Sequence, residues 1–442
     1  MRKYLIATMF FTISQLSFSQ KDVSTMDLRN FISNNLKDLE NLYLDLHQNP
    51  ELSFHEIETS KKMATILKGL GFEVTQNFGG NNVVGVYENG KGPVVLVRTD
   101  MDALPLVEKT NLPYASNITF QTKEGKQVGV MHACGHDIHM SVWAGTASTL
   151  IKFKNSWHGT LIMIAQQAEE MSGGANAMIE NGLFQKFPVP NYALALHVDP
   201  ELEAGTIGYC SGPAFAGVSS VDIRIYGEGG HGAIPHKTID PVVLAARTIL
   251  DIQTIVSREI SPLDPAVITV GSIHGGTKHN IIPDQVDLQL TLRFYKDEVY
   301  EQMLRSLNRI TAGIGESAGL SPDKFPKIIV SDDFTPPVIN DPLLTKAITG
   351  YFREAIGTEN VIVTDPLMAG EDFGRYGRTE EEIPIMMFML GTVSHENTVN
   401  QLENETTLPS LHSPYFAPDY QKTIETGTLG MSFSLIKLFN KK

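Results

Sequence analysis

The densest group of chemically capable side chains lies in the nine-residue segment MHACGHDIH, at residues 131–139. In order, this segment contains His132, Cys134, Gly135, His136, Asp137 and His139. Thiolate, imidazole and carboxylate groups are the ligands that divalent transition metals select, and glycine permits a backbone turn that other residues avoid. A single histidine such as His132 is more often a hydrogen-bonded structural residue, but the cluster as a whole predicts a metal site.

An acidic pair, Glu169–Glu170, follows the apolar run LIMIA at residues 161–165 and precedes MSGGANAMI, which reads as a helix start. Adjacent carboxylates are usually a solvated charge pair, but after a strand two neighbouring side chains point in different directions. One can then bind a metal while the other faces an attacking water as a general base. Because a metal lowers the pKa of a bound water toward ~7 and polarises a carbonyl, the pair and the cluster together indicate metal-dependent amide hydrolysis.

Two further histidines follow apolar runs: His197 comes directly after YALAL, and His412 lies in a loop beyond IPIMMFML. Either histidine alone would more often be structural. Polar residues follow four apolar runs of this chain, at residues 94–97, 161–165, 192–196 and 383–390. Because ligands in open α/β sheets gather beyond the carboxyl ends of the strands, these four segments predict one common site with both histidines in loops beside it.

The same runs alternate with helical stretches, which predicts an α/β domain with a mostly parallel, helix-flanked sheet. Residues 27–72 read as helices, interrupted at Pro50 and ended at Gly71. The residues after His139, MSVWAGTASTLIKF, also read as a helix. The cysteine–histidine cluster is therefore expected in a loop between a strand and a helix.

The pattern changes between residues 214 and 325, where a strand, a helix, two strands and a helix follow one another. This order predicts a small inserted α+β (ferredoxin-like) domain, with one sheet face covered by two helices. The expected metal-binding catalytic domain is therefore discontinuous and consists of residues 20–213 and 326–442.

The composition limits the class of protein and of partner. A chain of 442 residues with 42% hydrophobic residues can form two domains, each with its own core. The formal net charge is −15 and no basic stripe is present, which argues against a nucleic-acid partner. A small-molecule substrate remains the expected partner.

The N-terminal residues have the layout of a secretory signal peptide. Arg2 and Lys3 are basic, residues 4–11 are apolar, and Ser17 and Ser19 are small. A buried helix or a short membrane anchor would be the alternatives, but the apolar run is too short to span a bilayer. We expect residues 1–19 to be removed, which gives an exported protein, periplasmic or secreted, without a stable membrane anchor.

Nine segments, in the order in which they occur, resemble the M20 metallopeptidase superfamily: HQNPELSFHEIET (47–59), RTDMDALP (98–105), MHACGHD (131–137), AEEMSGGANAMI (168–179), ALHV (195–198), GGHGAIPH (229–236), NIIPD (280–284), GEDF (370–373) and LHSP (411–414). The chain is most similar to the amidohydrolase branch, subfamily D. This branch includes plant auxin-conjugate hydrolases, hippurate hydrolases and bacterial N-acyl amino acid amidohydrolases. The resemblance covers almost the whole mature chain, and the HACGHD sequence is specific to this branch.

The resemblance implies a site for two divalent metal ions, zinc or manganese, that hydrolyses N-acyl amino acids. The metal ligands it implies are Cys134, His136, Glu170, His197 and His412, with Cys134 bridging the ions. Glu169 would be the general base. Asp102 would orient a ligand without binding metal itself.

The resemblance also implies that the inserted domain is a lid and a dimerisation domain, so that the protein is a homodimer. In such proteins residues of the lid reach a neighbouring active site, which nominates His231, Asn280 and Arg293 for substrate binding. The planar guanidinium of Arg293 would pair with a substrate carboxylate, while His231 and Asn280 would hold the carboxylate or the developing oxyanion.

One residue departs from the family pattern, and the two cysteines raise a separate question. Residue 167 is glutamine in AQQAEE, where relatives usually have proline before the alanine. The chain also has two cysteines, Cys134 and Cys210, and a disulfide is the ordinary expectation for such a pair in an exported protein. We expect no disulfide here, because a thiolate that binds metal is already occupied.

Three functions are compatible with these residues. The first is an N-acyl amino acid amidohydrolase, and the second is a metallocarboxypeptidase or dipeptidase that acts on short peptides. The third is a catalytically silent binding protein. The presence of Glu169 beside five candidate ligands argues against the third, because a binding protein needs no base.

Overall fold

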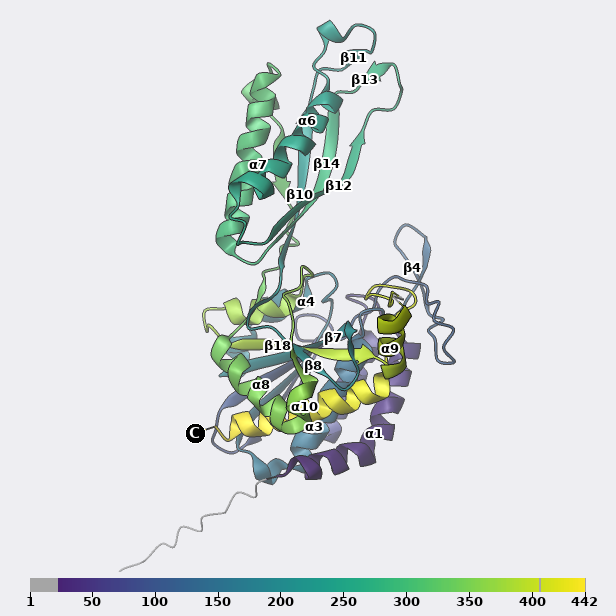
Figure 1. The fold of residues 1–442 in the computed structure, drawn as a ribbon, viewed down its shortest axis with the longest axis vertical. Helices are drawn as coiled ribbons and strands as arrows, with labels where there is room; N and C mark the ends of the chain where they lie inside the picture. Colours follow the sequence, from purple (N-terminus) through teal and green to yellow (C-terminus); the bar gives the residue numbers. More distant parts are fainter. Residues whose placement is uncertain (1–22, 405–406, 442) are drawn as a thin grey trace, which may run out of the picture.

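The computed structural model describes residues 23–404 and 407–441, so the predicted signal peptide, residues 1–19, lies outside the described residues. The larger of its two units is built on a mixed sheet of eight strands (Figure 1). These lie in the order β1 (Glu73–Gln76), β2 (Val83–Asn89), β6 (Gly159–Gln166), β3 (Val94–Asp100), β7 (Tyr192–Glu203), β18 (Ile385–Val393), β8 (Ile207–Tyr209) and β17 (Val361–Val363).

The four central strands, β6, β3, β7 and β18, are parallel neighbours and contain the four apolar runs seen in the sequence. Antiparallel pairs lie toward the two edges, between β1 and β2, β2 and β6, and β8 and β18. The predicted mostly parallel sheet is confirmed, with antiparallel strands added on both sides. Because the central strands run the same way, the polar residues at their carboxyl ends meet at one edge of the sheet.

Helices cover both faces of this sheet because side chains of a strand alternate between two apolar cores. In β3, Val95 and Val97 belong to one core and Leu96 belongs to the other. The first core is completed by α1 (Thr25–Gln48), α2 (Ile57–Gly69), α3 (His136–Lys152), α8 (Pro342–Ile356) and α10 (Tyr420–Phe439). The second is completed by α4 (Gly174–Glu180), α5 (Leu183–Lys186) and the 3-10 helix η6 (Asp372–Arg378).

Helix α3 occupies the centre of the first core. It packs against β3, α1 and α10, and nearly all its side chains are buried. A helix that is apolar on all sides belongs in the interior of a domain. Because His136 is the first residue of α3, this part of the predicted metal cluster stands on a rigid element.

The smaller unit is a four-stranded antiparallel sheet, shown above the larger unit in Figure 1. Its strands lie in the order β12 (Ala266–Gly275), β14 (Gln285–Phe294), β10 (Gly217–Tyr226) and β15 (Lys327–Val330). Helices α6 (Pro241–Thr254) and α7 (Asp297–Ser317) share its apolar core. Strand β15 lies just beyond residue 325, the end that the sequence predicted for the inserted domain.

Two adjacent segments of chain connect the units. Val218, at the start of β10, and Thr335 exchange two backbone hydrogen bonds, of 2.8 and 2.9 Å. Near them, β9 (Gly212–Phe215) pairs with β16 (Val338–Asn340). The small unit is thus connected to the sheet by a narrow two-stranded hinge.

The remaining elements lie around these two units. Among them are the hairpin β4 (Thr119–Gln121) and β5 (Gln127–Gly129), the pair β11 (Gly230–His231) and β13 (Ile281–Ile282), and helix α9 (His395–Asn404). Within residues 23–404 and 407–441, no helix combines the length and the apolar character that crossing a bilayer requires.

Candidate metal centre

Cys134 and His136 stand on either side of Gly135, at the start of helix α3. Gly135 has a φ of +73°, in the left-handed region that glycine adopts readily. A Cβ atom at this position would also lie 2.6 Å from Cγ2 of Val198, so that a larger residue has no room. The turn brings the Cys134 thiol to 3.5 Å from Nε2 of His197.

His197 lies inside strand β7, not in a loop after it as the sequence suggested. The apolar run ends at residue 196, but β7 continues to Glu203 because it stays paired with β18 beyond that point. The ring donates a hydrogen bond of 2.8 Å from Nδ1 to the carbonyl oxygen of Val198. Nε2 is therefore the nitrogen without a proton, and it faces Cys134.

Glu170 brings His136 and His412 together. Its Oε1 lies 3.4 Å from Nε2 of His412 and 3.9 Å from Nε2 of His136. His412 comes from the distant C-terminal loop, where its φ is +60° and its backbone N–H donates to the carbonyl oxygen of Ala133 over 2.9 Å. The loop is thus tied to the cysteine-containing turn at the position where His412 meets Glu170.

All five predicted metal ligands fall into groups whose ligand atoms lie within 4.8 Å of one another. One group is Cys134, His136 and His197, and another is Cys134, Glu170 and His412. Cys134 belongs to both groups. A pair of ions that share one thiolate requires this arrangement.

The donor atoms of these groups fit metal binding. Both ring nitrogens of His136 and Oε1 of Glu170 are buried without a hydrogen-bond partner among the described residues. Burial, followed by the nearby Glu170 and Glu169 carboxylates, raises the pKa of the Cys134 thiol well above its usual value. A buried thiol beside carboxylates ionises only when positive charge compensates it. Divalent cations would supply that charge.

Asp100 and His139 form a further close group with His136, but their atoms are already engaged. Asp100 accepts hydrogen bonds of 2.7 Å from Arg98 and of 2.7 Å from His139. His139 in turn accepts the backbone N–H of Val198. These residues therefore support the metal ligands rather than join them.

Asp102 stands behind the ligands, in the position expected for an orienting residue. Its Oδ1 lies 3.4 Å from Nδ1 of His136, and its two oxygens accept the backbone N–H groups of Glu169 and Glu170 over 3.1 and 3.0 Å. Ser53 donates a third hydrogen bond of 2.6 Å. Although burial alone would raise it, the contacts with His136 keep the pKa of Asp102 below its usual value.

Glu169 is buried beside this centre and is suited to hold a proton. Burial, followed by the carboxylates of Glu371 and Glu170, raises the pKa of Glu169 well above its usual value. Glu371 lies within 4.8 Å of Glu169, and the fully buried guanidinium of Arg98 donates a hydrogen bond of 3.0 Å to Glu371. Because a general base has to accept a proton readily, this environment suits the predicted role.

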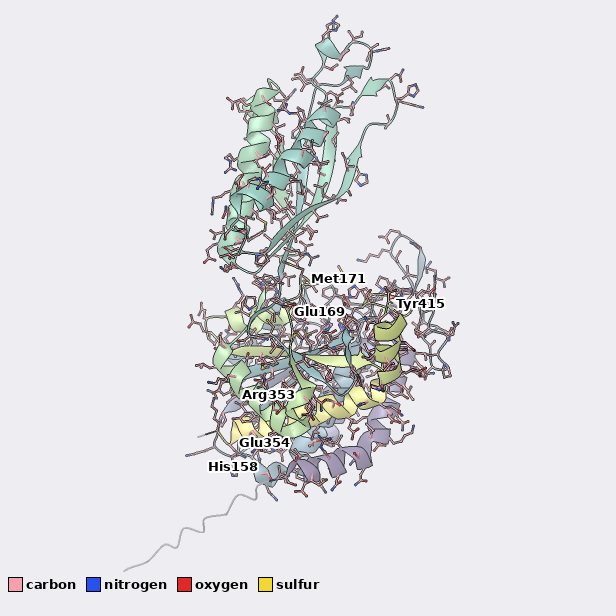
Figure 2. The ribbon with its side chains drawn as sticks, in the orientation of Figure 1. His158, Glu169, Met171, Arg353, Glu354 and Tyr415 are labelled. Carbon is pink, nitrogen blue, oxygen red and sulfur yellow. The ribbon has the colours of Figure 1, made fainter. Side chains whose placement is uncertain are left out.

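The centre opens into a cleft of about 600 Å³ between the two units. Figure 2 shows Glu169 and Met171 where the small unit meets the large one. The cleft is lined by Cys134, Glu169, Glu170, Met171, Ser172, His197, Phe215, Val218, Arg293, Asp333, Leu367, Ala369, Gly370, Leu411 and His412. Candidate ligands, a candidate base, apolar side chains and one arginine therefore face the same space.

Arg293 is the lid residue that the structure brings to this cleft. It extends from β14, whose register places it opposite Val218 of β10. Desolvation lowers the pKa of Arg293, and the described residues place no carboxylate within ion-pair distance of it. A half-buried guanidinium without a partner is ready to receive an anionic group.

His231 and Asn280 lie elsewhere. His231 belongs to β11 and Asn280 directly precedes β13, at the end of the small unit that lies farthest from the large sheet (Figure 1). Both residues are exposed, and neither lines the cleft of its own chain. Their predicted contact with substrate stays a prediction that depends on a neighbouring subunit.

The remaining predicted residues have clear positions. His132 is buried and was expected to be hydrogen-bonded, yet neither ring nitrogen has a partner in the described part of the chain. Burial lowers the pKa of His132 to about 4, so the ring is neutral.

Cys134 and Cys210 are both free thiols, and Cys210 donates to the carbonyl oxygen of Pro213 over 3.0 Å.

Sequence reasoning assigned no role to Arg98, Glu371 or Asp372, although they lie in the quoted RTDMDALP and GEDF segments. The Arg98 guanidinium is fully buried and contacts both acidic residues, at 3.0 and 2.9 Å. The available signal was an arginine directly after the apolar run VVLV, since a charge in that position needs a buried partner.

Known proteins resemble this chain in sequence and in fold. The sequence model of peptidase family M20/M25/M40 matches residues 96–413. The chain is 34% identical over 425 residues to thermostable carboxypeptidase 2 of Saccharolobus solfataricus, covering 94% of this chain and 100% of the relative. It is 36% identical over 350 residues to N-acetyl-L-cysteine deacetylase of Bacillus subtilis, covering 78% of each chain. The solved YxeP protein of Bacillus subtilis, described as a dinuclear metal binding peptidase of the M20 family, matches with a TM-score of 0.75 and 28% identity over 93% of this chain and 99% of that one.

Proposed function

The chain belongs to peptidase family M20/M25/M40 and is a metal-dependent hydrolase of C–N bonds, and we propose that its substrates are N-acyl amino acids. One observation carries this proposal. Arg293 and four of the five candidate metal ligands, all except the buried His136, line the same cleft. A substrate with a free carboxylate next to its amide bond would place the carboxylate on Arg293 and, at the same time, the amide at the metal ligands.

In this proposal, different residues of the site bind the metal ions, the substrate carboxylate and the acyl group. Cys134, His136, Glu170, His197 and His412 would hold two divalent ions, zinc or manganese, which polarise the amide carbonyl and lower the pKa of water. Arg293 binds the substrate carboxylate. The apolar side chains of Phe215, Leu367 and Leu411 receive the acyl group.

Glu169 acts as the general base in this scheme. It takes a proton from the attacking water as the oxygen–carbon bond forms, and returns that proton to the leaving nitrogen as the carbon–nitrogen bond breaks. The carboxylate is anchored for this role because the backbone N–H of Glu169 is held by Asp102. The products are a carboxylic acid and a free amino acid.

A second function, release of the C-terminal residue from short peptides, has one specific observation in its favour. A relative that matches the chain over 94% of its length carries the name carboxypeptidase. Both activities leave an amino acid with a free carboxylate, so that Arg293 would serve both. They differ in the group on the other side of the amide.

Amine release from a substrate panel separates these functions. The chain from Gln20 onward is supplied with manganese or zinc and offered N-acetyl, N-benzoyl and indoleacetyl amino acids beside simple dipeptides, with and without a chelator. Chelator-sensitive release from the N-acyl compounds supports the proposal. Release from dipeptides alone makes the protein a peptidase, and no release by the metal-loaded protein favours the binding-protein alternative.

We also propose export and dimerisation, which rest on the N-terminal sequence and on the family resemblance. Cell fractionation with mass measurement of the N-terminus would test removal of residues 1–19. Sedimentation of the mature chain would test the homodimer. A cytoplasmic, uncleaved chain or a monomer would contradict the respective proposal.

A further inference from the structure

The turn that carries Glu169 and Glu170 is held through its backbone. Four consecutive N–H groups donate to side-chain acceptors between residues 56 and 102. They are Gln167 to Asn82 (2.7 Å), Ala168 to Glu56 (2.7 Å), Glu169 to Asp102 (3.1 Å) and Glu170 to Asp102 (3.0 Å). No strand or helix makes these bonds, so the side chains determine the path of this turn.

Ala168 is the residue in this turn whose backbone conformation is unfavourable. Its φ is +49°, in the left-handed region where a Cβ atom is disfavoured. It directly precedes Glu169, so its conformation sets the direction in which the Glu169 side chain leaves the turn. Residues held in such conformations persist only where their surroundings over-determine them.

Glu56 supplies the bond to this strained residue. Oε1 of Glu56 accepts the Ala168 N–H, and Oε2 accepts a longer bond of 3.3 Å from Asn81. The residue is fully buried at the start of α2. No cation forms an ion pair with it in residues 23–404 or 407–441, while Asp102 lies close enough to disfavour its charge.

Burying the carboxylate of Glu56 here costs desolvation free energy, which its hydrogen bonds have to offset. Burial and the neighbouring Asp102 raise the pKa of Glu56 to about 7. An apolar residue of similar size would avoid the desolvation of a charge. Of the bonds that its carboxyl group accepts from other residues, the one from Ala168 is the shorter, at 2.7 Å against 3.3 Å from Asn81.

We propose that Glu56 is a positioning residue for hydrolysis, which acts through the backbone amide of Ala168 to aim Glu169 and Glu170 into the cleft. The inference rests on the proposed function of those two glutamates. It concerns the acceptor oxygen of Glu56 and not its charge. That distinction makes it testable.

Two variants separate the acceptor from the charge. Glu56→Gln removes the charge but keeps an oxygen within reach of Ala168, whereas Glu56→Asp keeps the charge but withdraws the oxygen by one methylene. With saturating metal and an N-acyl substrate, we expect Glu56→Gln to retain kcat within about threefold and Glu56→Asp to lower kcat about 10- to 100-fold, with KM changed little. Metal content and thermal unfolding are measured for both.

Hydrogen exchange gives a readout that does not depend on activity. In the metal-free protein, a peptide covering residues 165–172 should exchange faster in Glu56→Asp than in Glu56→Gln or the wild type. The matched control is Glu40, another buried carboxylate, which contacts Lys37 and Gln421 in the helical layer. Glu40→Asp and Glu40→Gln should change neither kcat nor exchange of this peptide.

The outcomes are distinct. Wild-type kcat and exchange in Glu56→Asp overturn the positioning role, and so does a Glu56→Gln variant that is less active than Glu56→Asp, because charge would then be the relevant property. If the wild type hydrolyses no amide, the proposed function fails. The exchange comparison still decides whether Glu56 holds the turn.

Discussion

The backbone N–H of Val198 donates a hydrogen bond of 2.9 Å to Nε2 of His139. That nitrogen therefore carries no proton, and the proton of the neutral ring lies on Nδ1, which donates 2.7 Å to Asp100. Both nitrogens are occupied, so His139 is not a metal ligand although it belongs to the cysteine–histidine segment. It fixes the strand position next to His197.

This relationship predicts that His139→Ala weakens metal binding without removing a ligand. Val198 loses its acceptor, and His197 loses the support of its neighbour. Residues that orient metal ligands contribute about 10- to 100-fold to metal affinity, and we expect a loss in this range, measured by competition with a chelator dye. The control is His158→Ala, because His158 lies at the opposite end of the larger unit from Glu169 (Figure 2). Equal affinity in the two variants would contradict the assignment.

Glu169 and His412 should give different defects. Glu169→Gln keeps a side chain of the same shape but cannot accept the proton, so we expect metal content to stay normal and kcat to fall by about 10²- to 10⁴-fold. His412→Ala should lose both metal and turnover, because it removes a candidate ligand. Metal analysis beside steady-state kinetics measures both quantities. If Glu169→Gln kept its turnover, Glu169 would not be the general base.

Much of this site could be predicted because its signals are local. Apolar runs of strand length mark β3, β6, β7 and β18, and the residues just after them lie at one edge of a parallel sheet by the geometry of the fold. The segment around Cys134 brings three potential ligand types within nine residues. Such patterns need no knowledge of distant contacts.

The supporting contacts could not be predicted because they join distant positions. The role of His139 depends on Val198, 59 residues away, and the buried charge of Arg98 depends on Glu371, 273 residues away. His197 was expected in a loop because apolar character ends before it, whereas β7 continues by pairing with β18. Hydrogen bonds between residues so far apart produce no periodic pattern in the sequence from which they could be predicted.

Gln167 shows how a departure from the family pattern gains a physical account. Its backbone N–H donates to Asn82, a bond that the proline of relatives cannot make. Its side chain accepts from the N–H of Asn81 and donates to the carbonyl oxygen of Gly79. Glutamine thus connects the catalytic turn to the loop before β2, although nothing in the local sequence indicates that loop as its partner.

Gly135 should tolerate alanine far less well than a glycine of equal φ. Gly135→Ala meets both the left-handed φ of +73° and the 2.6 Å contact with Val198. At Gly319 the φ is +76°, but no atom lies within 4 Å of an added Cβ. We expect Gly319→Ala to cost about 1 kcal/mol of unfolding free energy, which is the conformational penalty alone. Gly135→Ala should cost more and should also lower metal affinity, as urea unfolding and metal titration would measure. Similar losses would mean that the contact with Val198 relaxes freely.

His47 should make the stability of the fold depend on pH. It is buried between Asp137, 2.7 Å from Nδ1, and Glu108, 3.3 Å from Nε2. Although burial alone would lower it, these hydrogen bonds raise the pKa of His47 to about 9. Because the folded pKa lies above the unfolded value of about 6.5, the stabilisation is fully present below pH 6.5 and is lost as the pH rises through 9.

The measurement is urea unfolding of the wild type and of His47→Gln at several pH values between 6 and 9.5. Other groups titrate in both proteins, so the difference between them isolates His47. We expect that difference to shrink by on the order of 3 kcal/mol or less across this window. A difference that is constant with pH would show that His47 is not protonated in the folded protein.

Arg293 should determine the affinity for the carboxylate of the substrate. A charge-assisted hydrogen bond to a desolvated guanidinium contributes about 1.5–3 kcal/mol, which corresponds to roughly a 10- to 150-fold change in affinity. Arg293→Ala should therefore raise KM by this factor for an N-acyl amino acid. For the matching carboxamide, which lacks the anion, the same variant should change KM by less than about threefold, because the ion pair is absent in both proteins.

Two further variants complete this test. Arg293→Lys keeps the charge without the planar fork and should lie between the wild type and the alanine variant. Arg224→Ala is the matched control, since Arg224 stands on the neighbouring strand β10 and pairs with Asp287 away from the cleft. If Arg293→Ala raised KM equally for the acid and the carboxamide, the arginine would act on the shape of the cleft. The anionic end of the substrate would then have to be bound by another group, and the exposed His231 and Asn280 of a neighbouring subunit would be the next candidates.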